Sequence, residues 1–407
     1  MTKDSVPKNT NDILRYEREK RGWSQNRLAE LIGADTSMIS RWECGDRKPG
    51  HFYQEKLCDL FGKDAVELGL IEQRKNAEST QPSLTSLEVH EEVEDKLDHA
   101  ESLIDLAWEA WFASRPKEAA RSVNRLLPRL EKIAYGLYQP SYTLRAKELT
   151  VRAHGLLGTI CLDALQNDTS LFHYMQAHRF AEEIHDVNLA ATYLCLIGDV
   201  LRRQNDQTGA LKHMEQARDS ASHASKTTRG HILQLLAYTY GDIKQEAAFE
   251  RAISEATDLL AFSGEGIDAA QKEFIPFEIY EIRGKVYRDL GKPLDALPYL
   301  ELAEKSLATA DSVTPRWHAL LEISRAQACC DAGNISTGIE LACKGFIMAY
   351  QCHSPRQMNR VRKLLRKLEK GPFHNHPRVQ DLKNLLYETY MRLNSDDSPT
   401  NPLHNPL

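Results

Sequence analysis

Apolar residues near the N-terminus recur at the spacing of helices, three and four positions apart. They predict two short amphipathic helices, over residues 24–33 and 35–43. The residues that form their two apolar faces are Leu28, Leu31, Ile32, Ile39 and Trp42. Ser24 and Asp35 stand where an N-cap is needed, because a short side-chain oxygen accepts from the unpaired N–H groups of a first turn. Gly33 lies where the chain must leave the first helix with a positive φ.

The same periodicity extends to either side of this pair. A preceding helix is expected from Thr10 or Asn11 to Arg21, where Gly22 ends it. A fourth helix is expected over residues 53–61, and a fifth over residues 64–70. The pattern therefore predicts a five-helix domain over residues 10–72.

The apolar periodicity is lost after this domain. Residues 73–94 are predicted to be a linker, a flexible hinge followed by the start of a helix, because the first half is polar and carries Pro82. Residues 394–407 are rich in Pro, Asn and Ser and are predicted to be a disordered tail.

Between the linker and the tail, residues 95–393 are helical in pattern and repeat themselves. In the clearest unit, small residues stand at the first, thirteenth and twentieth positions, and large ones at the fourth and seventeenth. That unit is Gly284, Tyr287, Ala296, Leu300 and Ala303. The same register fits Gly198, Leu201, Ala210, Met214 and Ala217, and also Ala326, Cys329, Gly338, Ala342 and Gly345. Small residues let paired helices approach closely, so the chain is predicted to be all-α with an α-solenoid of helical hairpins.

Composition narrows the classes of protein. The 407-residue chain has a net charge of −6 and no apolar run of the roughly 18 residues that span a membrane, so no membrane partner is expected. A polar N-terminus without a signal-peptide core, and eight Cys without C-x-x-C pairs, predict a cytoplasmic protein with reduced thiols. No phosphate-binding loop, dinucleotide fingerprint or hydrolase motif occurs. We therefore expect no enzyme, no cofactor and no metal.

Charge in the first domain is uneven. Basic residues gather near its first helices and after its third, and they are Arg15, Arg18, Lys20, Arg21, Arg27, Arg41, Arg47 and Lys48. A local patch of this kind can neutralise phosphates even in a chain that is acidic overall.

Residues 10–72 resemble the phage-repressor-like, XRE-type helix-turn-helix family. The resemblance is carried by Trp23-Ser24-Gln25, Leu28-Ala29, Ile32-Gly33, Met38 to Glu43, Gly45, Arg47 and Pro49. It implies that the third helix enters the major groove, where Arg41 reads guanine and other side chains hold phosphates. The DNA-binding candidates are Gln25, Arg27, Thr36, Ser37, Met38, Ser40, Arg41, Arg47 and Lys48. Trp42 is expected in the core, and Glu43 is expected to tether an arginine.

The repeat region resembles the tetratricopeptide repeat, with a period lengthened to roughly 40 residues; a generic helical-hairpin solenoid is the alternative. First helices of such repeats line a concave groove. The groove-facing candidates are Arg152, Thr159, Asp199, Arg202, Gln234, Tyr238, Glu281, Lys285, Arg288 and Gln327. Side chains of these types hold an extended peptide's backbone or carboxylate, although a polar stripe can also be merely hydrated.

The combination of modules resembles quorum-sensing, peptide-responsive regulators. It implies a homodimer that binds a double-stranded DNA operator and senses a short peptide, although the assigned groove positions lack the asparagine that such regulators commonly use. The alternative hypothesis is a protein-interaction scaffold, in which the solenoid binds a partner protein and the first domain only docks it.

Overall fold

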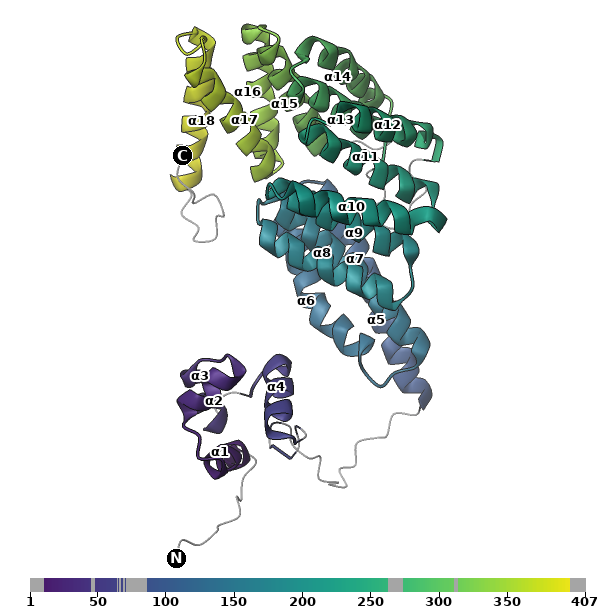
Figure 1. Ribbon diagram of the computed structural model, residues 1–407, viewed down its shortest axis with the longest axis vertical. Coiled ribbons are helices and arrows are strands. Elements are labelled where there is room, and N and C mark those ends of the chain that lie inside the picture. The colour runs from purple at the N-terminus through teal and green to yellow at the C-terminus, as the bar shows by residue number, and fades with distance from the viewer. Residues whose placement is uncertain are drawn as a thin grey trace, which may run out of the picture. The chain divides into compact units, whose positions relative to one another are not determined.

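The computed structural model describes residues 11–44, 48–63, 65, 67, 68, 70, 86–262, 274–310 and 314–395 (Figure 1). Every regular element assigned among these residues is a helix. The chain divides into two compact units, residues 1–84 and residues 85–407, and each is described here by itself.

Unit 1 contains α1 (Asn11–Lys20), α2 (Gln25–Ile32), α3 (Thr36–Glu43) and α4 (His51–Phe61). The predicted N-caps are present: Ser24 Oγ accepts from the Arg27 N–H at 3.1 Å, and Asp35 Oδ1 accepts from the Ser37 N–H at 2.8 Å. Gly33 has φ of 67°, the left-handed conformation that ends α2. Local sequence therefore sets both ends of the turn between α2 and α3.

The core of unit 1 forms where these helices converge. Its fully buried side chains include Leu28, Ile32, Ile39, Leu57 and Leu68, with Trp42 also buried. The prediction that Leu31 shares this core is wrong, because Leu31 lies beside the buried stripe of α2 and is 40% exposed.

The predicted fifth helix over residues 64–70 is also not found in the described part of that segment. Residues 65, 67 and 68 lie in turns, and residue 70 lies in a bend. The Leu70 N–H donates to the Ala65 oxygen at 2.9 Å, a five-residue span that closes a turn rather than continuing a helix. The segment still buries Leu68 and Leu70, so its apolar residues contribute to the core without helical geometry.

Unit 2 is a solenoid of antiparallel helical hairpins, visible from blue to yellow in Figure 1. The hairpins are α5 (Ser86–Phe112) with α6 (Pro116–Ala134), α7 (Pro140–Asp163) with α8 (Asn167–Glu183), α9 (Val187–Arg203) with α10 (Gln207–Ser220), α11 (Lys226–Asp242) with α12 (Glu246–Asp258), α13 (Pro276–Asp289) with α14 (Pro293–Ala308), α15 (Pro315–Asp331) with α16 (Ile335–Gln351), and α17 (Pro355–Lys370) with α18 (Pro377–Ser395). Short 3-10 turns, η1 (Ala221–His223) and η2 (Leu260–Phe262), follow α10 and α12. Residues 86–94, assigned above to the linker, belong to α5.

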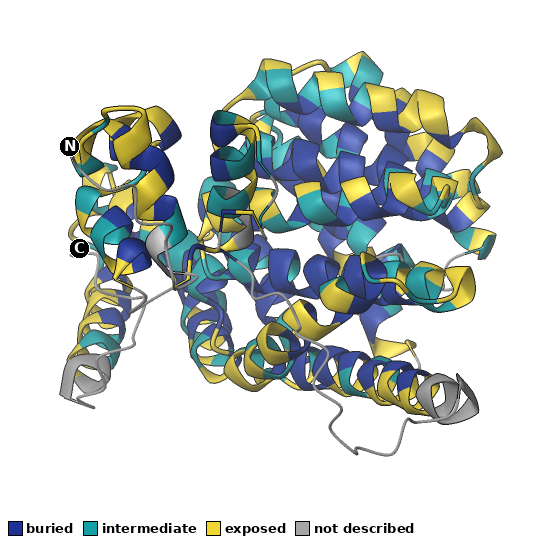
Figure 2. Ribbon diagram, turned by 90° about the horizontal axis from the view of Figure 1, so that it is seen from below, coloured by how far each residue is buried: buried dark blue, intermediate teal, exposed yellow. Residues whose placement is uncertain are grey.

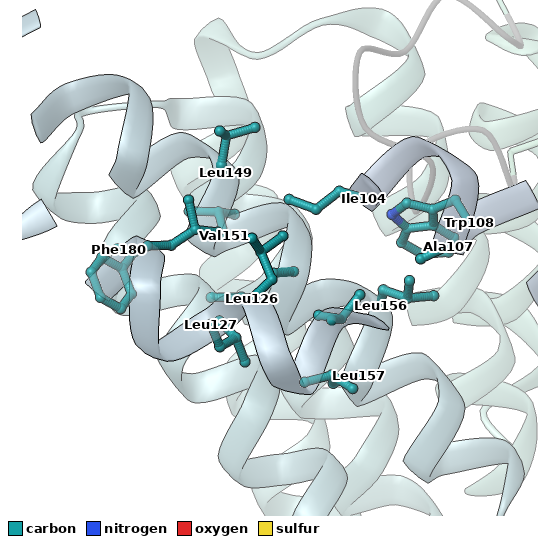
Figure 3. Packing of buried hydrophobic residues seen from close by; sticks show 14 of the residues in the cluster. Ile104, Ala107, Trp108, Leu126, Leu127, Leu149, Val151, Leu156, Leu157 and Phe180 are labelled. Carbon is teal, nitrogen blue, oxygen red and sulfur yellow. The ribbon is translucent and has the colours of Figure 1, made fainter. Parts of the chain in front are cut away.

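Small residues set the spacing within the hairpins, as the repeat register predicts. A side-chain carbon added at Gly198 would lie 2.6 Å from Met214 Cγ, and one added at Gly284 would lie 2.6 Å from Leu300 Cγ. These glycines therefore pack directly beneath the large residues of the partner helix. Buried residues cover the facing surfaces of the paired helices (Figure 2). The cluster in Figure 3 shows the same packing among α5 to α8.

The turn inside most hairpins repeats one backbone motif. The second residue after the first helix has positive φ, as at Leu165 (62°), Asn205 (69°), Lys244 (60°), Gly291 (80°) and Gly333 (88°). The N–H of the next residue donates to a carbonyl five residues earlier, for example from Gln245 to Tyr240 at 2.9 Å. This is the Schellman pattern, which satisfies the last carbonyls of a helix and fixes the reversal of the chain.

Lys244→Gly is expected to stabilise the solenoid by roughly 1 kcal/mol, because a non-glycine residue in the left-handed region carries about that much strain. Lys244 is exposed, so the substitution removes little packing. The control is Lys212→Gly, the same exchange at an exposed position inside α10, where glycine costs about 1 kcal/mol. Urea unfolding should therefore give opposite signs for the two variants. Equal losses of stability in both would contradict the strain at Lys244.

Candidate DNA-binding face and solenoid cavity

The first helices of the hairpins enclose a cavity of about 140 Å³ inside the solenoid. It is lined by residues of α7, α9, α11, α13, α15 and α17, together with Trp111 of α5 and Tyr174 of α8. Of the predicted groove residues, Thr159, Asp199, Gln234, Tyr238, Glu281 and Lys285 line it. The register therefore places these six side chains around one space.

The other four predicted groove residues lie outside the lining. Arg202 donates a hydrogen bond to Asp199. Arg288 and Arg360 both donate to Gln327 Oε1. Arg152 instead forms ion pairs with Glu101 and Asp105 of α5. It is therefore engaged within the first hairpins.

Asp199 is the buried centre of one side of the cavity. Its Oδ1 accepts from Arg202 Nη2 at 2.7 Å, and its Oδ2 accepts from Arg203 Nε at 2.8 Å. Arg202 also donates to Asp242 Oδ2 at 2.6 Å, and its guanidinium carbon lies 4.0 Å from the centre of the Tyr238 ring. Although burial opposes ionisation, the neighbouring guanidinium groups lower the pKa of Asp199.

A second ionic cluster lies across the cavity, around Glu281. Ser324 Oγ donates to Glu281 Oε1, and Lys285 Nζ lies 3.7 Å from Glu281 Oε2. Arg360 donates to Ser324 Oγ at 2.7 Å and to Gln327 Oε1 at 2.8 Å. Burial, with Arg288 and Arg356 nearby, lowers the pKa of Arg360 to about 10.

Three polar side chains that line the cavity have polar atoms without a hydrogen bond or ion pair to a described residue. Both ring nitrogens of His231 and the Oε1 atom of Gln234 are buried without a hydrogen bond among the described residues. Arg356 also lines the cavity, and no hydrogen bond or ion pair to a described residue holds its guanidinium group. Burial lowers the pKa of His231 to about 4, so the ring is neutral near pH 7.

Contacts between distant hairpins complete the cavity wall. Asp163, the last residue of α7, accepts from Arg316 Nη1 at 2.7 Å and from Ser354 Oγ at 2.7 Å. The Arg316 guanidinium carbon lies 3.9 Å from the centre of the Trp111 ring, and its Nη2 donates to the Cys352 oxygen at 2.8 Å. The second hairpin is therefore bonded directly to the last two.

In unit 1, one face of α3 is turned away from the core. Ser37 and Arg41 are exposed, and Thr36 and Ser40 are half-buried. Ser37 and Arg41 are four residues apart and lie on the side of α3 opposite the buried Ile39, whereas Thr36 and Ser40 flank the buried side. Thr36 Oγ1 donates to Asn26 Oδ1 at 2.7 Å, whereas no hydrogen bond or ion pair to a described residue holds the Arg41 guanidinium group.

The remaining DNA-binding candidates have different surroundings. Met38 packs against the core, and Gln25 Nε2 donates to Glu43 Oε2 at 2.8 Å. Arg27 is exposed and pairs with Glu30 at 3.1 Å. Lys48 is exposed, and Arg47 lies outside the described residues. Gln25 and Met38 are thus held by the domain, while Arg27 and Lys48 lie at its surface.

A buried ion pair fixes α3 against α1. Arg18 Nε donates to Glu43 Oε1 at 2.6 Å, and Arg18 Nη2 donates to Glu43 Oε2 at 2.9 Å. Arg18 Nη1 also donates to the Trp23 oxygen at 2.7 Å, in the turn before α2. The two-point pairing sets the orientation of both side chains. Glu43 thus tethers an arginine, and one ionic group joins α1, the turn and α3.

Residues 14–68 match a protein family described as helix-turn-helix. The N-terminal domain is an XRE-type helix-turn-helix. No curated protein sequence matches the chain.

Several solved structures are similar in fold. Aspartyl phosphate phosphatase F from Bacillus subtilis is 12% identical, with a TM-score of 0.45, and the match covers 88% of this chain and 97% of that one. A Rap protein complexed with Competence and Sporulation Factor is 13% identical, with a TM-score of 0.44 and coverage of 74% and 93%. PlcR from Bacillus thuringiensis, in complex with a peptide and DNA, is 13% identical, with a TM-score of 0.34 and coverage of 74% and 95%.

Within the described ranges, no group of three or more His, Cys, Asp or Glu side chains is arranged to hold a metal ion. No helix in the described part of the chain has the length and apolar character needed to cross a membrane.

Sequence reasoning missed several lining residues of the cavity. Arg203 is the residue after the predicted Arg202 on α9. The repeat register could therefore have indicated that it lies near the cavity. Arg356 lies on α17, which lacks the small-and-large signature of the other hairpins. Its place in the wall depends on the curvature of the whole solenoid.

Glu43→Ala is expected to destabilise the helix-turn-helix domain by roughly 3 kcal/mol, because it leaves the Arg18 charge buried without its partner. The control is Glu30→Ala, which breaks the exposed pair with Arg27 and should change stability by less than about 1 kcal/mol. Hydrogen exchange of peptides from residues 11–44 resolves this domain from the solenoid. Equal protection from hydrogen exchange in the two variants would show that the buried Arg18–Glu43 pair does not stabilise the domain more than the exposed pair does.

The stability of the solenoid is expected to fall as pH falls from 6.5 toward about 4. In that interval the unfolded chain protonates His231 at its ordinary pKa, whereas the folded protein does not. The unfolded state therefore binds more protons, and this group contributes a slope of up to about 1.4 kcal/mol per pH unit. His231→Leu should make the decline shallower, as measured by urea unfolding at several pH values. Gln234→Leu, a neighbouring substitution without a titrating group, should keep the wild-type slope; the same slope in both variants would refute the assignment.

Proposed function

We propose that this protein is a sequence-specific transcription regulator whose helix-turn-helix domain binds double-stranded operator DNA. The observation that carries the proposal is the outward face of α3, where Ser37 and Arg41 are exposed on a helix fixed by the Arg18–Glu43 pair. A rigid helix with an unengaged guanidinium group is suited to reading a base edge in the major groove.

The solenoid is proposed to form the homodimer and to bind the regulatory ligand, with a short peptide as the expected ligand. The cavity supports a ligand-binding role, because it gathers buried polar groups that have no partner within the described residues. A ligand can change DNA affinity only if it favours one arrangement of the dimer over another. A two-fold dimer would require two half-sites in inverted orientation.

Selection of bound DNA from a random pool, at a stated salt concentration, is expected to enrich an inverted repeat. Arg41→Ala should weaken binding to the enriched site by about 1–3 kcal/mol and relax the preference at one base pair of each half-site. Non-specific binding should remain, since phosphate contacts are made by other residues.

The matched control is Arg125→Ala, which removes an exposed arginine from α6 of the solenoid and should leave the selected sequence unchanged. An enriched single site without symmetry would refute the two-fold dimer while keeping the regulator. Failure to enrich any sequence, with and without a peptide pool, would favour the protein-interaction scaffold.

A further inference from the structure

One arginine of the solenoid cavity has no acidic partner within the described residues, although the lining holds as many carboxylates (Asp163, Asp199, Glu278, Glu281) as basic side chains (Arg203, Lys285, Arg316, Arg356). Asp199 and Asp242 are bonded to Arg202 and Arg203. Arg356 is close enough to act electrostatically on both Asp199 and Arg203. Two carboxylates therefore face three guanidinium groups, and the third has no ion pair among the described residues.

The Arg356 charge affects neighbouring groups. Burial and the nearby Arg356 charge lower the pKa of Arg203, even though Asp199 accepts a hydrogen bond from it. Burial and the charges of Arg288 and Arg356 likewise lower the pKa of Arg360. A negative charge brought beside Arg356 would relieve both repulsions at once.

Unpartnered polar atoms lie in the same wall. Gln234 is 2% exposed and His231 is 1% exposed. No described residue donates to Gln234 Oε1 or forms a hydrogen bond with either ring nitrogen of His231. A neutral imidazole has one N–H donor to offer, and the Gln234 oxygen needs a donor from elsewhere. Buried polar atoms are paired in the great majority of cases, so these atoms mark a place for a ligand or ordered water.

The size of the space restricts the ligand. A volume of about 140 Å³ is below the roughly 300–1,000 Å³ of pockets that hold drug-sized molecules. It accommodates an acid group with a few further atoms, or the last residue of a longer chain, but not an entire peptide.

From these observations we propose that the cavity binds a carboxylate beside Arg356, with His231 donating to it and Gln234 accepting from an N–H or O–H of the same ligand. The carboxylate belongs either to a free small acid or to the C-terminus of a peptide. The inference deepens the proposed sensing role of the solenoid, but the binding step itself does not depend on DNA.

The full-length protein should be tested in a buffer free of carboxylates. The probes are acetate, succinate and glutamate, and a pentapeptide pool that contains no Asp or Glu, with free or with amidated C-termini. Binding is followed by the unfolding temperature and by tryptophan fluorescence, since Trp111 and Trp317 line the cavity. Free acids are expected to bind saturably, and the amidated pool is not.

Arg356→Gln is expected to weaken binding of the free acids by about tenfold or more, because it removes the charged donor. The matched control is Arg366→Gln, an exposed arginine on the same helix that does not line the cavity, and it should bind as the wild type does. Gln234→Met is a second variant, which keeps the positive charge of Arg356 but removes the side-chain oxygen of Gln234. It should weaken binding of glutamate, which carries N–H donors, more than binding of acetate, which has none.

Saturable binding by small acids alone assigns the site to a free acid, and binding by the free-acid peptide pool alone assigns it to a peptide terminus. Both results support the proposal when Arg356→Gln reduces binding. Equal binding by the amidated pool, no response to any free acid at millimolar concentration, or full binding by a folded Arg356→Gln variant would overturn it. DNA selection is a separate measurement, so an enriched operator without acid binding would reject this inference and leave the regulator standing.

Discussion

Burial of charge inside the solenoid is the constraint that organises unit 2. The first helices of the hairpins bury Asp199, Arg202 and Glu281 at or beside the cavity, and Arg360 bonds to the cluster around Glu281. An unpaired ion in such a place costs several kcal/mol, and Asp199, Arg202 and Glu281 each have a partner of opposite charge. The resulting bonds cross from α9 to α11, and from α13 to α15 and α17. The pairing thereby fixes how successive hairpins are turned toward one another.

The same physical rule shapes the helix-turn-helix domain on a smaller scale. Glu43 is buried because it lies four residues after Ile39, on the same core-facing side of α3, and Arg18 pairs with both of its carboxylate oxygens. Gln25 bonds to the same carboxylate, which joins the start of α2 to the end of α3. α3 is therefore positioned by its contacts with the core, while Ser37 and Arg41 remain exposed. The core contacts and the proposed DNA contacts lie on different sides of one eight-residue helix.

Much of the architecture could be predicted from local pattern. Gly198 and Gly284 indicated the hairpins because only small residues fit where two helices approach closely. Ser24 and Asp35 indicated where helices begin because their side chains can cap a first turn. The same reasoning failed at Leu31, where helical spacing does not tell which edge of an apolar stripe meets the core. It failed again at residues 64–70, whose leucines are buried by a turn.

The cavity was only partly predictable, for a different reason. Residues such as Gln234 and Lys285 follow from the repeat register, which is a local property of each hairpin. The contact of Asp163 with Arg316 and Ser354 joins residues 153 and 191 positions apart, and it depends on curvature accumulated over several repeats. Arg356 enters the wall through that same curvature, on a helix without the repeat signature. No short window of sequence contains this information.

The long-range contact also bears on how a ligand could act. Arg356 belongs to α17, whereas His231 and Gln234 belong to α11, and the intervening chain includes two complete hairpins. A ligand that bonds to both helices is held only when the turns of the solenoid are as close as Asp163 and Arg316 keep them. Its affinity is then higher for this arrangement than for a more open one, and that difference is the free energy available for regulation. A ligand held by α11 alone would have no such preference, however tightly it bound. The separation of its partners along the chain, rather than their number, therefore allows the site to couple ligand binding to the shape of the solenoid.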